Sequence, residues 1–285
     1  MGLRIQNNVE AFNTHRQLTT TSSAAAKSME KLSSGYRINR AADDAAGLAI
    51  SEKMRGQIGG LAQAQRNAQD GISLVQTAEG SLSEVHSMLQ RIRDLKVQYG
   101  NDTLSTDDRD AIAAEVYQIA NEIKNITDPA TGTQFNGKAV FGSAGFTFQA
   151  GANDGETVTT NAADFSGSIS GGGLSDITGI SSAAQAATAL STGGISTLLG
   201  LDNAIKNVSK VRSEFGAVQN RLEHRLNNLA TYQENLTASE SRIRDVDMAE
   251  EMTTFTKLNI LQQAGTSMLA QANQAPQNVL SLLRQ

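Results

Sequence analysis

The sequence predicts a mainly α-helical protein in which both chain ends form a long coiled-coil helical bundle around a small middle region with β-hairpins. Only 4% of the 285 residues are aromatic and none is Trp, although 39% are hydrophobic. This composition favours long helices packed through Ala, Leu, Ile and Val. Of the 25 Gly, 14 lie in residues 129–200, together with five of the eight Phe. The shift in composition separates a β-rich insert from two helical arms.

The N-terminal arm predicts two helices. Residues 45–99 as one helix would run roughly 80 Å at 1.5 Å per residue. Its apolar stripe is formed by Ala68, Ile72, Val75, Leu82, Val85, Leu89, Ile92 and Leu95. A shorter helix should begin at Ser105-Thr106 and end before Pro129, because the first pair can cap a helix and a proline often follows one.

The middle region predicts one hairpin and one short helix. Residues 146–150 alternate as a strand, residues 151–155 supply turn residues, and residues 157–160 return as the second strand. Ser182 and Gln185 have the spacing of a capping box, so a short helix should begin there and end at Gly193-Gly194.

The C-terminal arm carries a sustained heptad pattern. Ten of twelve core positions of one frame are apolar, with Arg225 and Ser239 as the exceptions. The apolar ten are Val208, Val211, Phe215, Val218, Leu222, Leu229, Tyr232, Leu236, Ile243 and Val246. Since neither arm can bury its stripe alone, the two chain ends should pair with each other.

The last helix is the most unusual segment, because residues 258–283 contain no charged side chain. Its many Gln and Asn residues disfavour a membrane span, and the absence of Lys and Glu disfavours a solvated helix. Leu261, Ala264, Met268 and Ala272 form a narrow helical stripe. We therefore expect this end to be covered by other protein chains and to be disordered in the monomer, where it would bury too little surface to offset chain entropy.

Composition and motifs exclude several other classes of function. The net charge of −5 disfavours nucleic acid as a partner, and a chain with no Cys has neither disulfides nor thiolate metal sites. His15, His86 and His224 are isolated, without metal-ligand spacing, and no nucleophile elbow is present. We expect no catalytic site, no metal and no cofactor. The chain has no apolar signal segment and no membrane span, and these facts alone would place it in the cytoplasm.

Several long motifs in both arms resemble those of bacterial flagellins. In the first arm these are Leu32–Asn39, Ala42–Gly47, Arg66–Ser73 and Gln76–Gly80. In the second arm they are Ser241–Ala249, Gln263–Gly265, Met268–Gln274 and Pro276–Leu283. The resemblance covers about residues 1–150 and 200–285, and it is specific because the motifs occur in order at both ends.

This resemblance implies a domain organisation and a function. Residues 1–42 and 246–285 would form an inner helical pair (D0-like), and residues 43–245 a helical bundle with a β-hairpin insert (D1-like). The variable outer part would span about 130–200, with no large D2 or D3 domain. The implied function is the structural subunit of the flagellar filament used for swimming motility; the alternative is a hook-filament junction protein. The implied location is extracellular, after type III export without a cleaved signal peptide, which would replace the cytoplasmic expectation.

The resemblance also implies partners. The chain would bind copies of itself, the flagellar export apparatus with its chaperone, and the filament cap and hook-filament junction proteins. A host Toll-like receptor that senses flagellin would recognise Arg91, Leu95 and Glu115; the alternative is that these residues form an exposed helix face with self-assembly contacts.

The candidate assembly residues lie near both ends of the chain: Ile5, Val9, Phe12, Arg37, Asp43, Asp44, Leu261, Ala264, Met268, Ala272, Leu280 and Leu283. For Asp43 and Asp44, beside Arg37 and Arg40, an intersubunit contact and a local role at a helix N-terminus are equally favoured.

Hydroxyl groups in the middle region are candidates for O-linked sugar: Thr160, Ser166, Ser168 and Ser170. The alternative there is an unmodified, solvated loop.

Overall fold

The computed structural model describes residues 8–142, 144–161, 177–191 and 197–283, with side chains through residue 274. The chain divides into two compact units. Unit 1 contains Met1–Gln57 and Glu234–Gln285, and unit 2 contains Ile58–Gln233. The predicted fold class is confirmed: the described elements are mainly long helices, with two short antiparallel hairpins in the middle of the sequence.

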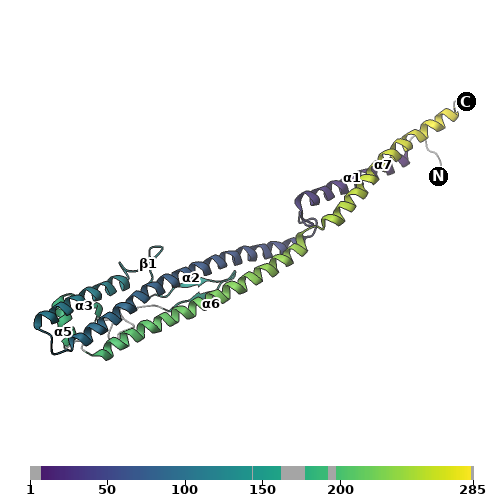
Figure 1. Cartoon of the computed structure of the whole chain (residues 1–285). Coiled ribbons are helices and arrows are strands. Elements are labelled where there is room, and N and C mark those ends of the chain that lie inside the picture. Colours follow the sequence, from purple (N-terminus) through teal and green to yellow (C-terminus); the bar gives the residue numbers. More distant parts are fainter. Residues whose placement is uncertain (1–7, 143, 162–176, 192–196, 284–285) are drawn as a thin grey trace. The chain divides into compact units, whose positions relative to one another are not determined.

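Unit 1 is built on an antiparallel pair of helices, α1 (Val9–Ser34) and α7 (Met248–Leu283) (Figure 1). Asn8 caps the start of α1 by accepting a hydrogen bond from the backbone N–H of Ala11, and its side-chain amide donates to the carbonyl of Ala272 at 2.7 Å. Gly35 ends α1 with φ of 76°, a left-handed cap that glycine adopts without steric cost. The pairing of the two chain ends therefore exists within one chain.

Two short connections meet in unit 1. Gly35–Asp44 links α1 to α2 (Ala45–Tyr99), and Asp245–Asp247 links α6 (Leu198–Arg244) to α7. The backbone N–H of Arg37 donates to the carbonyl of Arg244 at 2.7 Å, and that of Val246 donates to Gly35 at 3.0 Å. The largely buried Arg244 guanidinium stacks on the Tyr36 ring and forms an ion pair with Glu52. Backbone pairing and the contacts of Arg244 with Tyr36 and Glu52 thus hold the two connections together.

Unit 2 is organised around α2 and α6, two long helices that also extend into unit 1. Within unit 2 they run antiparallel, as shown by the ion pairs Arg93–Asp202 and Glu79–Arg212. Helix α3 (Thr106–Thr127) and helix α5 (Ala183–Ser191) complete the bundle (Figure 1). Helical spacing predicted most of its core, which includes Leu82, Val85, Leu89, Ile92, Val116, Ile123, Val208 and Leu222.

Local sequence explains where the shorter helices begin. Ser105 accepts from the backbone N–H of Asp108, and the Asp108 carboxylate accepts from the backbone N–H of Ser105, which is a capping box at the predicted start of α3. Ser182 accepts from the N–H of Gln185 at the start of α5, as expected. The Gln185 side chain, however, accepts from Ser181 rather than from Ser182. Gly193 and Gly194 lie outside the described residues.

Two hairpins lie between α3 and α5 in the sequence. Strands β3 (Thr147–Gln149) and β4 (Thr157–Thr159) pair in the predicted order, with Phe148 opposite Val158. Strands β1 (Gln134–Phe135) and β2 (Lys138–Ala139) form a hairpin that the sequence analysis missed. Its two-residue turn, Asn136-Gly137, has positive φ at both positions, and an Asn-Gly pair is the strongest short signal for such a turn.

Two predicted core positions of the α6 heptad pattern, Tyr232 and Arg225, are explained by their surroundings in the structure. Tyr232 is 45% exposed, so the prediction that it lies in the core was wrong. Arg225, an exception to the apolar pattern, donates from Nε to the carbonyl of Ala150 at 2.8 Å. The position is polar because it holds the backbone of the β3–β4 hairpin against α6.

Candidate assembly surfaces

Helix α7 carries two stripes, and only one of them faces α1. The stripe toward α1 is more covered and follows a heptad spacing: Phe255, Leu258, Gln262, Gly265, Leu269 and Ala272. Gly265 allows close approach here, because an added Cβ would lie 3.2 Å from Cδ1 of Leu18. Apart from Leu18, the covered side chains along this part of α1 are small or polar, including Thr14, Thr21, Ala25 and Ser28. The α1–α7 contact is therefore close but weakly apolar.

The second stripe of α7 contains three of the predicted assembly residues, Leu261, Ala264 and Met268, and is open to solvent. Leu261 is 46% exposed, Met268 is 55% exposed, and Ala264 lies exposed between them. Ala272 differs, since it is 8% exposed and its carbonyl accepts from Asn8. Ile260 adds a further apolar side chain at 61% exposure. A row of uncharged, exposed apolar side chains is typical of a surface covered by another protein.

The N-terminal candidates are also exposed where they are described. Val9 is 58% and Phe12 is 71% exposed. Phe12 borders an open groove of about 410 Å³ between α1 and α7, lined also by His15, Leu269 and Asn273. Ile5 and the side chains of Leu280 and Leu283 lie outside the described residues.

Asp44 has a local helix-capping role. Its carboxylate accepts from the N–H of Gly47 at 2.9 Å, which caps the start of α2. A Cβ added at Gly47 would lie 2.5 Å from Oδ2 of Asp44, so a side chain at this position would displace the capping carboxylate. This contact corresponds to the local alternative of the sequence analysis.

Asp43 is held by one lysine and two backbone groups. Its carboxylate lies 2.8 Å from Nζ of Lys27 and accepts from the N–H groups of Asn39 and Arg40. The Lys27 ammonium first, and the Arg40 backbone N–H second, stabilise the charged form and lower the pKa of Asp43 to about 2.

The two arginines beside Asp43 have other partners. Arg37 donates to the carbonyl of Ile243 at 2.6 Å, and Arg40 pairs with Glu30 at 2.9 Å. Within the single chain, therefore, Asp43 and Asp44 form no side-chain ion pair with Arg37 or Arg40.

The three predicted receptor residues do not share one environment. Arg91 on α2 and Glu115 on α3 form an exposed ion pair, with Nη2 and Oε1 at 2.7 Å. Leu95 is 1% exposed and belongs to the core of unit 2. Its burial corrects the expectation that Leu95 offers an apolar contact to a receptor, because its side chain is already covered by the bundle.

Thr160 does not suit O-linked sugar in the folded chain. It is 6% exposed, and its hydroxyl accepts from the N–H of Phe146 at 2.8 Å. The hydroxyl thus closes the β3–β4 hairpin instead of facing solvent. Ser166, Ser168 and Ser170 lie outside the described residues.

The described part of the chain contains neither a candidate membrane-spanning helix nor a cluster of metal ligands. None of its helices combines the length and the apolar content needed to cross a bilayer. No group of three or more His, Asp or Glu side chains is placed there to hold a metal ion.

Comparison with known proteins agrees with the arrangement of the two arms. The bacterial flagellin N-terminal helical region matches residues 5–144, and the bacterial flagellin C-terminal helical region matches residues 198–283. The flagellin of Bacillus subtilis (strain 168) is 50% identical, over 99% of this chain and all of its own length. That of Halalkalibacterium halodurans is 51% identical, over 98% of this chain and 99% of its own.

A solved structure, that of Bacillus cereus flagellin, aligns at a TM-score of 0.45 with 30% identity, covering 57% of this chain and 88% of its own. The two family regions coincide with the helical arms that form the bundle and the terminal pair, and the full-length relatives match nearly every residue. The chain therefore belongs to the bacterial flagellin family.

Proposed function

We propose that the chain is a structural subunit that polymerises with copies of itself into the bacterial flagellar filament, an extracellular fibre that propels swimming cells. Family membership supports this function and does not favour the hook-filament junction alternative. The observation that carries the mechanism is the exposed apolar stripe of α7 around Leu261 and Met268. It remains open after α1 has covered the other stripe, so it is free for neighbouring subunits.

Polymerisation requires a heterologous contact, in which one patch fits a different patch on the next copy and repetition gives a helix. We assign the α1–α7 pair to the inner wall of the filament, as a D0-like domain, and the bundle of unit 2 to a surrounding D1-like domain. About 70 residues separate the arms, which supports a filament without large D2 or D3 domains. The role is structural, without catalysis or a cofactor.

The terminal pair should become fully ordered only on assembly. Among the described side chains of α1 and α7, few apolar ones are completely buried in the single chain, and the contact includes Thr21 and Ser28. Burial of this small area offsets little conformational entropy. Hydrogen exchange should therefore be fast for α1 and α7 amides in dilute monomer and slow in the filament. Slow exchange in the monomer would contradict this ordering step.

Weakly ordered ends also fit export. A subunit whose ends do not polymerise early can pass unfolded through a narrow type III channel, with an export chaperone covering the uncharged tail. Addition of subunits beneath a cap, beyond a hook-filament junction, follows from the same function.

Recognition by the host Toll-like receptor would use the exposed Arg91–Glu115 pair, without Leu95. Loss of receptor signalling in Arg91→Ala, with normal folding, would test that contact.

The function is tested by seeded growth. Full-length protein added to filament fragments should form long fibres visible by electron microscopy, whereas a chain lacking Leu258–Gln285 should keep a helical, monomeric unit 2 and form none. Met268→Glu provides a milder variant, because a charge in a covered apolar contact costs several kcal/mol without a partner. Fibres of normal length from both variants would refute the inner-wall assignment.

A further inference from the structure

An exposed apolar cluster lies on unit 2, far from the terminal pair in sequence. Arg93 of α2 and Asp202 of α6 are joined at 2.8 Å on antiparallel helices. Val97 lies one turn beyond Arg93 and Leu198 one turn before Asp202, so the two are neighbours on adjacent helices. Val97 is 56%, Leu198 39% and Leu199 70% exposed. We call these three residues the apolar knob.

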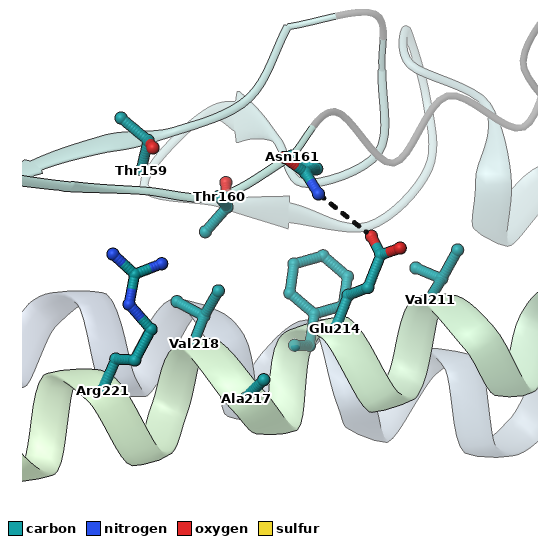
Figure 2. A pocket seen from close by; sticks show the side chains of 9 residues that line it. Thr159, Thr160, Asn161, Val211, Glu214, Ala217, Val218 and Arg221 are labelled. Atoms are coloured by element: carbon teal, nitrogen blue, oxygen red, sulfur yellow. Dashed lines mark hydrogen bonds between the residues drawn. The ribbon is translucent and has the colours of Figure 1, made fainter.

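A pocket lies farther along α6, beneath the end of the β3–β4 hairpin. Figure 2 shows Val211 and Val218 on α6 pointing toward the strand that carries Thr159 and Thr160. Ala217, an exposed residue of α6, also lines the pocket. Its volume is about 230 Å³. A cavity of roughly 150 Å³ holds benzene, so this pocket has room for one branched aliphatic side chain.

The pocket has charges of opposite sign at its two ends. Glu214 lies at one end, where its carboxylate accepts from the side-chain amide of Asn161 at 3.4 Å, and Arg221 lies at the other (Figure 2). The two residues are seven positions apart, or about two turns of α6. This polarity gives the pocket a preferred direction for an incoming charged segment.

The knob and the pocket of one copy cannot meet. Leu199 and Ala217 are 18 residues apart on α6, roughly 27 Å at 1.5 Å per residue. We propose that the apolar knob of one copy inserts Leu199 into the α6–hairpin pocket of a second copy, with the two α6 helices side by side and parallel. This inference rests on the proposed function, because polymerisation supplies the second copy.

The proposed polymer selects the parallel arrangement, and charge is compatible with it. With Leu199 placed beside Ala217 of the neighbour, Asp202 lies level with position 220 in the parallel case, one residue from Arg221, and level with Glu214 in the antiparallel case. Arg93, which pairs with Asp202 at 2.8 Å, accompanies Asp202 in both cases, so direction follows from the need for a contact that repeats. The parallel contact joins the knob of one copy to the pocket of the next, which leaves the pocket of the first copy and the knob of the second free. The contact can therefore repeat, with a stagger of roughly 27 Å between copies. An antiparallel contact would use both knobs and both pockets at once and would close into a dimer.

Disulfide trapping tests the contact, since the chain has no natural Cys. Leu199→Cys and Ala217→Cys are introduced together; both positions are exposed, so folding should be retained and is checked by circular dichroism. Filaments grown from this variant are oxidised mildly and run on a denaturing gel. The matched control combines Leu199→Cys with Gln219→Cys, which lies about 200° around α6 from Ala217.

The expected result is a ladder of covalent oligomers from Leu199→Cys/Ala217→Cys filaments, no cross-link in dilute monomer, and little in the control, because a disulfide needs Cα atoms within about 7 Å. Filaments without the ladder, an equally strong ladder in the control, or a band limited to dimers would each overturn the parallel contact. Wild-type protein that forms no fibres would refute the proposed function itself, and the knob contact with it.

Discussion

Met268→Ala should weaken polymerisation without destabilising the folded subunit. Met268 is 55% exposed in the single chain. Burying a whole Met side chain contributes about 1.5–3 kcal/mol, so covering the open half in the filament would contribute at most about 0.8–1.6 kcal/mol. Since 1.4 kcal/mol corresponds to a factor of about ten, the critical concentration should rise about 4- to 15-fold.

The assay is sedimentation of seeded filaments over a range of total protein, with the unpolymerised concentration read from the supernatant. Met88→Ala is the matched control, because Met88 packs against the core of unit 2. It should lower the free energy of unfolding by about 1–2 kcal/mol, less than the 2–5 kcal/mol typical of a fully buried Met. A Met268→Ala subunit with the wild-type critical concentration would refute the assignment of this stripe to the filament contact.

Three further predictions concern the folded chain. Leu82→Ala, at a fully buried site, should lower the free energy of unfolding of unit 2 by about 2–5 kcal/mol in urea titrations followed by circular dichroism; a loss below 1 kcal/mol would contradict the described core. Ser105→Ala removes the capping box of α3 and should cost about 1 kcal/mol in the same titration, with Ser87→Ala on an exposed face as the neutral control. Asp43 contributes stability above the ordinary carboxyl pKa of 3.8, and this contribution is lost as the pH falls toward its folded pKa of about 2; Asp43→Asn should therefore destabilise unit 1 at pH 6 but not at pH 2. An Asp43 carboxyl that titrates near 4 by NMR would exclude the Lys27 contact.

Helical spacing predicted the long elements accurately because their apolar stripes are long and regular. Residues 45–99 form one helix as expected, and Ser105 begins α3. The β1–β2 hairpin was missed although Asn136-Gly137 marks its turn, since two-residue strands are too short for an alternating pattern. Tyr232 was misplaced because a heptad frame records spacing and not whether a partner helix covers each position.

For the candidate assembly surface on α7, too, sequence predicted one part and packing decided the other. The uncharged composition of residues 258–283 by itself indicated a helix to be covered by protein. Composition could not say which stripe of α7 would face α1, because both stripes are apolar and uncharged. Packing decided it: Gly265 and Leu269 meet α1, and Leu261 and Met268 stay open.

Sequence alone determined the class of fold and the location of the unusual tail, since these depend on periodicity and composition within continuous segments. The family was indicated by the resemblance of ordered motifs at both ends of the chain. Only tertiary structure decided which side chains remain available. It buried Leu95 and Thr160, paired Asp43 with Lys27, and separated the knob at Leu199 from the pocket near Ala217. The physical reason is that exposure depends on which neighbours the folded chain brings against each residue, and those neighbours come from distant parts of the sequence.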